Sequence, residues 1–222
     1  MQKNLTRAAL AATFALTLSH ATFAADVPAP QGDKLAMDIQ SCSSGSTPEM
    51  RIAGCSAAIS SGQLDPGNAA RALNNRGNAY LASGQIDRAI ADYTNAIQIA
   101  PSAVGYFNRG NAYLKKEQYD LAEKDYDAAL KLDPNLADAY LNRGVTFTNR
   151  GQYDRAIADY NEVMRLRPNF ATAFVKRGTA YFGKGDLTKA IADYDEALRL
   201  EPTNTQAAEM KKRAHDAQKG KH

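Results

Sequence analysis

Two cysteines are the residues with the clearest capacity for chemistry. Cys42 and Cys55 lie 13 positions apart in a chain of 222 residues, and they are its only cysteines. Such a pair can form a structural disulfide, act as a redox couple or supply half of a metal site. The last two interpretations are disfavoured because the spacing is not Cys-x-x-Cys, and because only His215 and His222 remain as imidazole ligands beyond the first 24 residues.

The other polar residues form no recognisable catalytic motif. The sequence has no Gly-x-Ser-x-Gly nucleophile elbow, no phosphate-binding loop, no cluster of metal ligands and no histidine-based dyad. The 24 aspartates and glutamates fall largely in repeating columns on expected helix surfaces, where a pair of them has no pocket in which to act as acid and base. We therefore expect a protein that is not an enzyme and that needs no cofactor or metal.

A repeat defines the elements that must position these residues. An arginine–glycine pair recurs at intervals of 33, 34 and 34 residues, and an alanine, a tyrosine and a proline follow each glycine after 12, 16 and 24 residues. The glycines are Gly77, Gly110, Gly144 and Gly178, and the tyrosines are Tyr93, Tyr126, Tyr160 and Tyr194. A fixed period near 34 indicates a stack of identical supersecondary units.

Each unit is predicted to contain two helices. In the third unit, apolar residues at helical spacing predict helices over residues 136–150 and 153–166. Pro168 then ends the unit, because proline cannot continue a helix. The repeated glycine lies in the middle of the first helix, where it costs about 1 kcal/mol relative to alanine. We expect close approach of the small alanine on the second helix to compensate for this cost.

Glycine also marks the turn between the two helices of most units. Gly84, Gly151 and Gly185 occupy this column, whereas the second unit has Glu117. The exception predicts that the second unit's turn needs no left-handed residue at that position.

With these columns, the chain resembles the tetratricopeptide repeat family. The resemblance rests on the Gly-x-x-Tyr/Phe run, as in Gly77/Tyr80, and on the alanine, tyrosine and proline columns, and it covers about residues 69–203. It implies an all-α fold, a right-handed α-solenoid of helix-turn-helix repeats with a C-terminal capping helix. It also implies a non-catalytic scaffold that binds proteins or peptides, because the family supports many such functions.

The same pattern predicts the domain organisation. A degenerate helical hairpin with a disulfide is expected over residues 34–65, four repeats over 69–203, and the capping helix over 204–218. The four repeats are expected at about residues 70–102, 103–136, 137–170 and 171–203.

The N-terminus has the features of an export signal. Lys3 and Arg7 precede an apolar stretch of 11 residues, and Thr22-Phe23-Ala24 offers a cleavage site before Ala25. The sequence therefore predicts a signal peptide over residues 1–24, a flexible lead over 25–33, and export, which means the periplasm in a Gram-negative cell. The apolar run is too short to span a bilayer, so we expect no stable membrane insertion.

Export permits a disulfide between the two cysteines. Their spacing of 13 equals that of the aromatic pair in each unit, such as Tyr80 and Tyr93. We predict that the Cys42–Cys55 disulfide replaces this aromatic pair in the N-terminal hairpin. Closing so short a loop should contribute about 3 kcal/mol. Ser46 or Thr47 supplies the start signal of the hairpin's second helix.

Each unit also carries one arginine and one aspartate in fixed columns. The pairs are Arg76 and Asp92, Arg109 and Asp125, Arg143 and Asp159, and Arg177 and Asp193. These columns predict a repeated ion pair between helices of the same or of adjacent units. A charged stripe that binds a ligand is the alternative, but residues that read a ligand usually vary between repeats, and we interpret the pairs as structural.

The binding surface is expected on the first helix of each unit, on the concave side of the solenoid. Helix geometry places four positions per unit on a face away from the glycine and tyrosine packing stripe. The predicted groove residues are Asn75, Asn78, Asn108, Asn111, Lys115, Asn142, Asn149 and Lys176. An amide offers both a donor and an acceptor to the backbone of an extended segment, although asparagine can equally be a tolerated polar filler. Phe107, Leu141 and Val175 suggest an apolar seat beside them.

Two functions from different classes follow. The first is an exported scaffold or adaptor that binds a peptide segment or a partner protein in its groove. The second is a self-associating structural solenoid, a homo-oligomer in the cell envelope. Nucleic acid is disfavoured as a partner, because the formal charge of +3 falls further once Lys3 and Arg7 are removed with the signal peptide.

Overall fold

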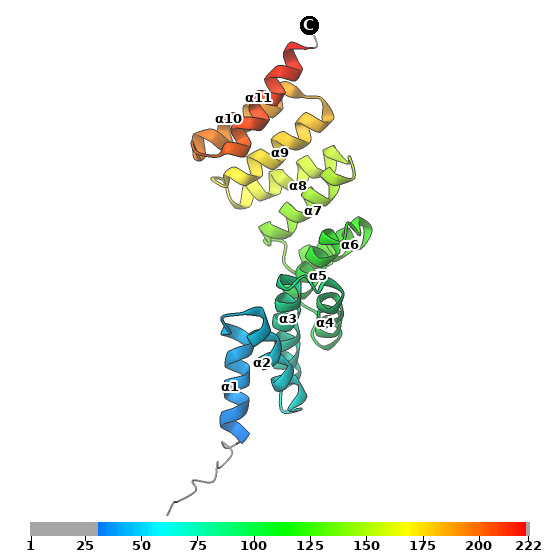
Figure 1. Ribbon diagram of the computed structural model, residues 1–222. Helices are drawn as coiled ribbons and strands as arrows, with labels where there is room; N and C mark the ends of the chain where they lie inside the picture. The colour runs from blue at the N-terminus through cyan, green and yellow to red at the C-terminus, as the bar shows by residue number, and fades with distance from the viewer. Residues whose placement is uncertain (1–30, 221–222) are drawn as a thin grey trace, which may run out of the picture.

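The computed structural model describes residues 31–220, so the predicted signal peptide at residues 1–24 lies outside the described residues. Every regular element in the described range is an α-helix (Figure 1). The helices are α1 (Gln31–Ser44), α2 (Pro48–Ser60), α3 (Pro66–Ala82), α4 (Ile86–Ile99), α5 (Ala103–Lys115), α6 (Tyr119–Leu132), α7 (Ala137–Asn149), α8 (Tyr153–Leu166), α9 (Ala171–Lys184), α10 (Leu187–Leu200) and α11 (Thr205–Lys219).

The helices form an elongated all-α solenoid with α1 at one end and α11 at the other (Figure 1). Each odd-numbered helix from α1 to α9 packs against the even-numbered helix that follows it, and α11 packs against α10 and α9. The first helices of successive units, α3, α5, α7 and α9, also contact one another in order. None of the described helices is long and apolar enough to cross a membrane.

Side-chain caps begin several of these helices where the sequence predicts a start. Thr47 caps α2 by accepting a hydrogen bond from the backbone N–H of Met50 at 3.2 Å. Ser102 caps α5 in the same way through the N–H of Gly105 at 3.1 Å. Such caps satisfy N–H groups that lack a partner in the first turn of a helix. The helix α1 already begins at Gln31, so the predicted flexible lead over 25–33 was too long at its C-terminal end.

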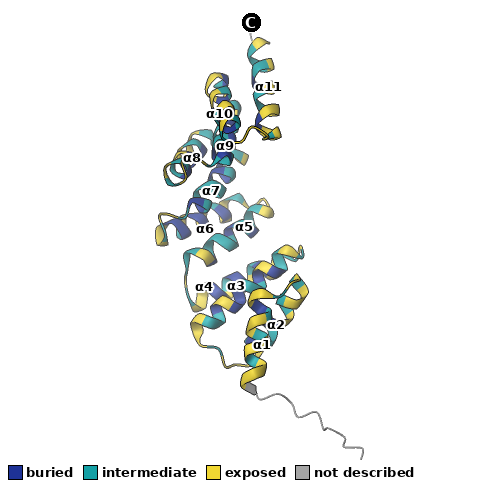
Figure 2. Cartoon of the chain, turned by 90° about the vertical axis from the view of Figure 1, so that its left-hand side faces the viewer, coloured by how far each residue is buried: buried dark blue, intermediate teal, exposed yellow. Residues whose placement is uncertain are grey.

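The repeated tyrosines form the centre of each unit. Tyr93, Tyr126, Tyr160 and Tyr194 are all fully buried. Figure 2 shows that buried residues occur along the whole stack of helices and not in one central region. A Cβ added to Gly144 would lie 2.6 Å from Cε1 of Tyr160, and the other three repeated glycines face their tyrosines in the same way. The prediction that these glycines accommodate the partner helix's alanine was therefore wrong. They accommodate a tyrosine ring.

The turn inside the second unit also differs from the sequence prediction. Glu117 has φ 58°, in the left-handed region that Gly84, Gly151 and Gly185 occupy in the other units. In every unit the residue after this position donates a backbone hydrogen bond back into the first helix, as Gln118 does to the carbonyl of Tyr113 at 2.9 Å. The turn geometry therefore requires a left-handed residue whatever the side chain, and the unit bears the strain of a glutamate there.

Candidate functional site

The predicted groove residues all lie on the first helices of the four repeats, α3, α5, α7 and α9. Two positions before each repeated glycine stand the four residues that we call the groove row, which are Asn75, Asn108, Asn142 and Lys176. Each of them is half-buried, and each comes from a helix that contacts the next helix in the row. The structure thus places one half-buried polar residue per repeat on helices that contact one another in order.

A hydrogen bond joins two of the predicted groove residues across neighbouring repeats. The Nδ2 of Asn142 on α7 donates to Oδ1 of Asn111 on α5 at 2.8 Å. The same oxygen accepts a hydrogen bond from the hydroxyl of Tyr126, also at 2.8 Å. The two asparagines are therefore fixed in place relative to each other and to the core of the second repeat.

The buried tyrosine hydroxyls give other predicted groove residues a supporting role. Tyr93 donates to Oδ1 of Asn78 at 2.7 Å, so this oxygen already has a partner. In the third repeat, valine takes the place of that asparagine, and the hydroxyl of Tyr160 lies 3.1 Å from that of Thr148. Sequence reasoning treated Asn78 and Asn111 as free donor–acceptor groups, but their oxygens satisfy the tyrosines.

The fourth repeat lacks this support. Thr179 replaces the asparagine and donates its hydroxyl to the carbonyl of Val175 at 2.9 Å. The hydroxyl of Tyr194 is buried without a hydrogen-bond partner within the described residues.

Burial raises the pKa of Tyr93 and Tyr126 above the ordinary tyrosine value, because the phenolate cannot be hydrated there.

At the C-terminal end, the predicted groove residues meet the capping helix. Asn149 and Lys176 line a hollow of about 160 Å³ together with Gln206 and Met210 of α11. The repeat pattern predicts α11 as a cap on the last repeat but does not indicate that Gln206 and Met210 adjoin the predicted groove residues. Lys115 is exposed on α5, outside this hollow.

The three residues of the predicted apolar seat pack against the cores of the repeats, but to different extents. Val175 is 2% exposed and belongs to the core around Tyr194. Phe107 packs against the ring of Tyr126, with 6.2 Å between the ring centroids. Leu141 packs against the core of the third repeat. Val175 is therefore not accessible to a ligand, whereas Phe107 and Leu141 are half-buried and pack between helices while staying partly exposed.

The arginine and aspartate columns form the predicted ion pairs. Arg76 donates from Nε and Nη2 to the two oxygens of Asp92 at 2.7 and 2.8 Å. The other three repeats contain the same bidentate pair. Hydrogen bonding to the aspartate raises the pKa of Arg76, so the guanidinium stays charged. Removing one partner of such a half-buried pair would leave a charge without compensation.

The same arginines also connect each unit to the one before it. The remaining Nη1 of Arg76 donates to the hydroxyl of Ser56 on α2 at 3.0 Å. In the later repeats Nη1 reaches the equivalent position, the residue that follows the preceding unit's tyrosine. These acceptors are Thr94, Asp127 and Asn161. The guanidinium groups also stack beside aromatic rings, as Arg109 does between Tyr106 and Tyr113. The columns are therefore structural, within and between units.

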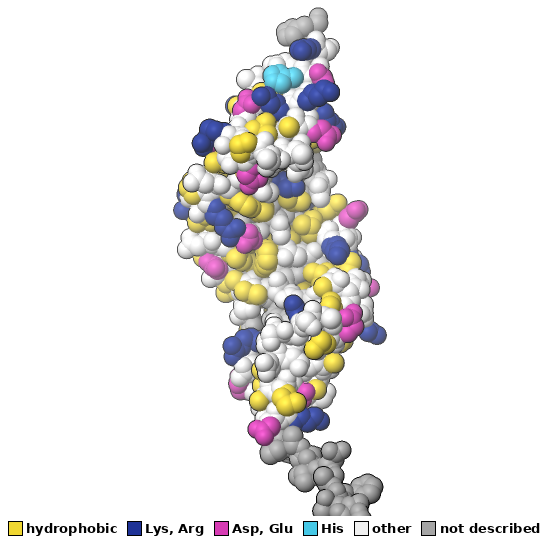
Figure 3. All heavy atoms as spheres, turned by 60° about the vertical axis from the view of Figure 1, so that its left-hand side comes forward, with side chains coloured by type: hydrophobic (Ala, Val, Ile, Leu, Met, Phe, Trp, Pro, Cys, Tyr) yellow, Lys and Arg dark blue, Asp and Glu magenta, His cyan; other side chains and the backbone are white. Residues whose placement is uncertain are grey.

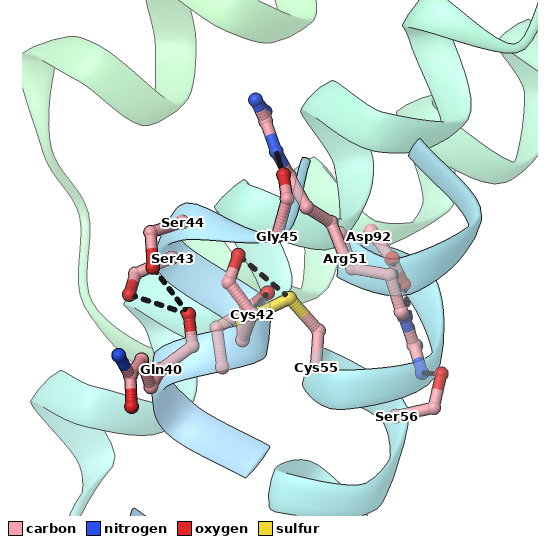
Figure 4. The surroundings of a disulfide bond; sticks show 11 residues. Gln40, Cys42, Ser43, Ser44, Gly45, Arg51, Cys55, Ser56 and Asp92 are labelled. Atoms are coloured by element: carbon pink, nitrogen blue, oxygen red, sulfur yellow. Dashed lines mark hydrogen bonds and ion pairs between the residues drawn. A yellow bond between two sulfur atoms is a disulfide. The ribbon is translucent and has the colours of Figure 1, made fainter. Parts of the chain in front are cut away.

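The two cysteines form the predicted disulfide. It joins α1 to α2 with 4.4 Å between the Cα atoms of Cys42 and Cys55 (Figure 4). Cys55 is fully buried, and Cys42 is 3% exposed. Neither sulfur is a free thiol, and the bonded pair has the same spacing of 13 residues as the aromatic pair of each repeat.

Comparison with known protein families agrees with this geometry. The family model described as "Tetratricopeptide repeat" matches residues 70–102, 103–136 and 171–204, and a second of the same description matches 125–158. One described as "TPR repeat" matches residues 144–185. The chain belongs to the tetratricopeptide repeat family. No match was found among the curated proteins.

Solved structures of other tetratricopeptide repeat proteins have a similar fold. MamA aligns with a TM-score of 0.67 and 24% identity, over 79% of this chain and 96% of that chain. YrrB, described as "a TPR protein with an unusual peptide-binding site", aligns with a TM-score of 0.64 and 26% identity, over 74% of this chain and 84% of that chain. The first repeat domain of Spaghetti (RPAP3), bound to the HSP90 peptide SRMEEVD, aligns with a TM-score of 0.51 and 28% identity, over 52% of this chain and 92% of that chain.

Proposed function

We propose that this protein is an exported, non-catalytic adaptor that binds an extended segment of a partner protein along the groove row. The family and its solved relatives support a protein-interaction module as the general function. The observation that carries the finer proposal is the Asn142–Asn111 hydrogen bond, because it shows that polar side chains of adjacent repeats adjoin on one face.

The chemistry of this face suits a backbone more than a particular side chain. Asn108 is half-buried and makes no side-chain hydrogen bond within the described residues, so its amide offers a donor and an acceptor to a passing chain. Figure 3 shows one face of the molecule, on which charged groups of both signs are interspersed with hydrophobic side chains. Two of the solved relatives, YrrB and the Spaghetti domain, are described with a peptide-binding site or a bound peptide, which supports an extended ligand here.

Photo-crosslinking in the native host tests the proposal. A photoreactive phenylalanine analogue is placed in the full-length protein at Asn108 or Asn142, and a matched control at Lys131, which is exposed on α6. Adducts with a partner protein are expected from the two groove positions and not from position 131. Adducts from position 131 alone would place the binding surface on the second helices. Adducts with the mass of a dimer would support the homo-oligomer instead.

The same cells test export. The mature protein should be recovered from the envelope fraction, with an N-terminus at Ala25 by mass spectrometry. A full-length N-terminus recovered from the cytoplasmic fraction would contradict this part of the proposal.

A further inference from the structure

A hollow of about 140 Å³ lies between α1, α2 and α3, next to the disulfide. It is lined by Ile39, Cys42, Ser43, Ala58, Leu64, Asn68, Arg71, Ala72 and Asn75. Its surface is mostly apolar, through Ile39 and Leu64 in particular. An apolar cavity of about 150 Å³ can hold a benzene molecule, so this one has room for a branched aliphatic side chain.

The hollow has one charged wall. Arg71 is its only charged lining residue and forms no ion pair within residues 31–220. Its Nη2 donates to Oδ1 of Asn68 at 2.5 Å. Asn68 in turn donates its backbone N–H to Asp65 at 2.9 Å and its side-chain amide to the other oxygen of that carboxylate. This chain of bonds orients the guanidinium and leaves its other N–H groups available for a ligand.

Asp65 is the acidic residue nearest in sequence to Arg71, but it forms the N-cap of α3 and no ion pair with Arg71. The pKa of Asp65 is lowered first by the hydrogen bonds from Asn68 and only last by the charge of Arg71. A second carboxylate can therefore approach Arg71 without displacing an existing ion pair.

The hollow is continuous with the groove row. Asn75, the first member of the row, forms part of its lining. A segment lying along Asn142, Asn108 and Asn75 therefore reaches the hollow at the N-terminal end of the described solenoid. The Cys42–Cys55 disulfide holds α1 against α2 and so fixes one wall.

We propose that this hollow binds one aliphatic side chain of the extended partner segment, and that Arg71 pairs with an aspartate or glutamate side chain next to it in that segment. The proposal rests on the proposed function and adds a sequence preference to it, an aliphatic residue next to an acidic one. Amide groups of the groove row recognise the backbone, and the hollow recognises the side chains.

Short blocked peptides test the hollow directly. The probe is acetyl-glycyl-leucyl-aspartyl-glycine amide, titrated into the oxidised protein while the methyl signals of Ile39 are followed by NMR. We expect saturable shifts at millimolar peptide. Replacing the leucine by alanine, or the aspartate by asparagine, should each weaken binding at least fivefold. A peptide ending in leucine with a free carboxylate should bind no better than the asparagine peptide. Tighter binding of that peptide would contradict the proposal that Arg71 pairs with an acidic side chain.

Two adjacent serines provide a matched pair of variants. Ser43 and Ser44 are both exposed, and both donate to the carbonyl of Gln40, at 3.1 and 2.9 Å (Figure 4). Only Ser43 lines the hollow. Ser43→Leu should abolish the Ile39 shifts and Ser44→Leu should preserve them, with equal melting temperatures. Arg71→Gln should reduce the affinity for the aspartate peptide to that for the asparagine peptide.

The results separate this inference from the proposed function. Shifts that survive Ser43→Leu, or that appear at Asn108 and not at Ile39, would overturn the hollow as the binding site and leave the groove row standing. Binding in the hollow combined with crosslinks only from position 131 would instead contradict the groove. An absence of saturable shifts with any of the peptides overturns the hollow.

Discussion

The N-terminal hairpin and the four repeats are all pairs of packed helices, but different interactions hold the two helices of a pair together. In a repeat, a glycine on the first helix admits the ring of a tyrosine from the second, as Gly77 admits Tyr93. In the hairpin the glycine is on the second helix. A Cβ on Gly54 would lie 2.6 Å from Cβ of Ser41 and 2.7 Å from the backbone nitrogen of Cys42. The repeats are thus held by a ring and an ion pair, and the hairpin by backbone contact and a covalent bond.

This difference makes the stability of the two regions depend on different conditions. Residues 31–65 contain no tyrosine, and Gly54 stands where each repeat has its aspartate, so the hairpin has neither the buried phenol nor the internal ion pair. The repeats contain no cysteine. Reduction should therefore act on the hairpin and alkaline pH on the repeats. Since each unit of a solenoid contacts only its neighbours, the two effects should be separable.

The largest effect is expected from filling the space of a tyrosine ring. Gly144→Leu should destabilise the protein by at least about 3 kcal/mol, because the new side chain would overlap Tyr160. Urea unfolding followed by circular dichroism measures the change. The same substitution at Gly32, where nothing lies within 4 Å, should change the free energy of unfolding by less than about 0.5 kcal/mol. Equal effects at both sites would contradict the ring packing.

Loss of the disulfide should have the next largest effect, confined to the hairpin. The double variant Cys42→Ala and Cys55→Ala should lower the stability of α1 and α2 by about 3 kcal/mol, because the unfolded hairpin regains the freedom of an open loop. Hydrogen exchange should show faster exchange in residues 31–60 and unchanged exchange in α7 to α10. Reduced wild-type protein provides the control and should give the same pattern. Uniform loss of protection would show that the hairpin and the repeats unfold as one unit.

The tyrosine hydroxyls should have a smaller effect that differs between repeats. Tyr126→Phe should cost about 1 kcal/mol, because it removes the hydrogen bond to Asn111 at 2.8 Å. Tyr194→Phe should cost almost nothing or should stabilise the protein, since that hydroxyl is buried without a partner. Urea unfolding at pH 7 measures both. The prediction fails if the two variants lose equal stability.

The same hydroxyls make the repeats sensitive to alkali. The folded-state pKa of Tyr126 is raised by burial, so the unfolded chain releases this proton first as the pH rises. The contribution of the buried neutral tyrosine to the free energy of unfolding is fully present below about pH 10. Above that pH, the free energy of unfolding decreases by about 1.4 kcal/mol per pH unit for each such tyrosine. Tyr126→Phe should reduce this slope in unfolding measurements between pH 9 and 11. The N-terminal hairpin should be unaffected over this range.

The smallest expected change concerns the inner turn of the second repeat. Glu117→Gly should stabilise the protein by about 0.5 kcal/mol, because glycine adopts the left-handed conformation without strain. The reciprocal change Gly151→Glu should cost a similar amount in the third repeat. Thermal unfolding of the two variants and of the double variant tests whether the two turns are equivalent.

The sequence predicted the structural features that recur in every repeat and missed those that depend on the side chains of one unit. The period located the helices, the ion pairs and the disulfide, because each depends on spacing along one hairpin. It could not show that Glu117 would adopt a glycine conformation, since the turn is imposed by backbone hydrogen bonds from Glu117 and Gln118 back to α5. It could not show that Asn111 supports Tyr126, because helix periodicity gives the face of a residue but not the bonds that it makes. The hollow beside Arg71 arises where the irregular hairpin meets the first repeat, a junction that no repeat pattern describes.

The Nη1 atoms of the repeated arginines form hydrogen bonds that always run from one unit to the unit before it. Arg109 reaches back to Thr94, and Arg177 reaches back to Asn161, so the donor always belongs to the later unit and the acceptor to the earlier one. The ion pair with the aspartate closes inside the unit that carries the arginine. A chain that becomes available for folding from its N-terminus, as during export, presents each acceptor before the arginine that binds it. Each unit can therefore form its own ion pair and pack onto a predecessor that is already in place, in order from the N-terminus to the C-terminus.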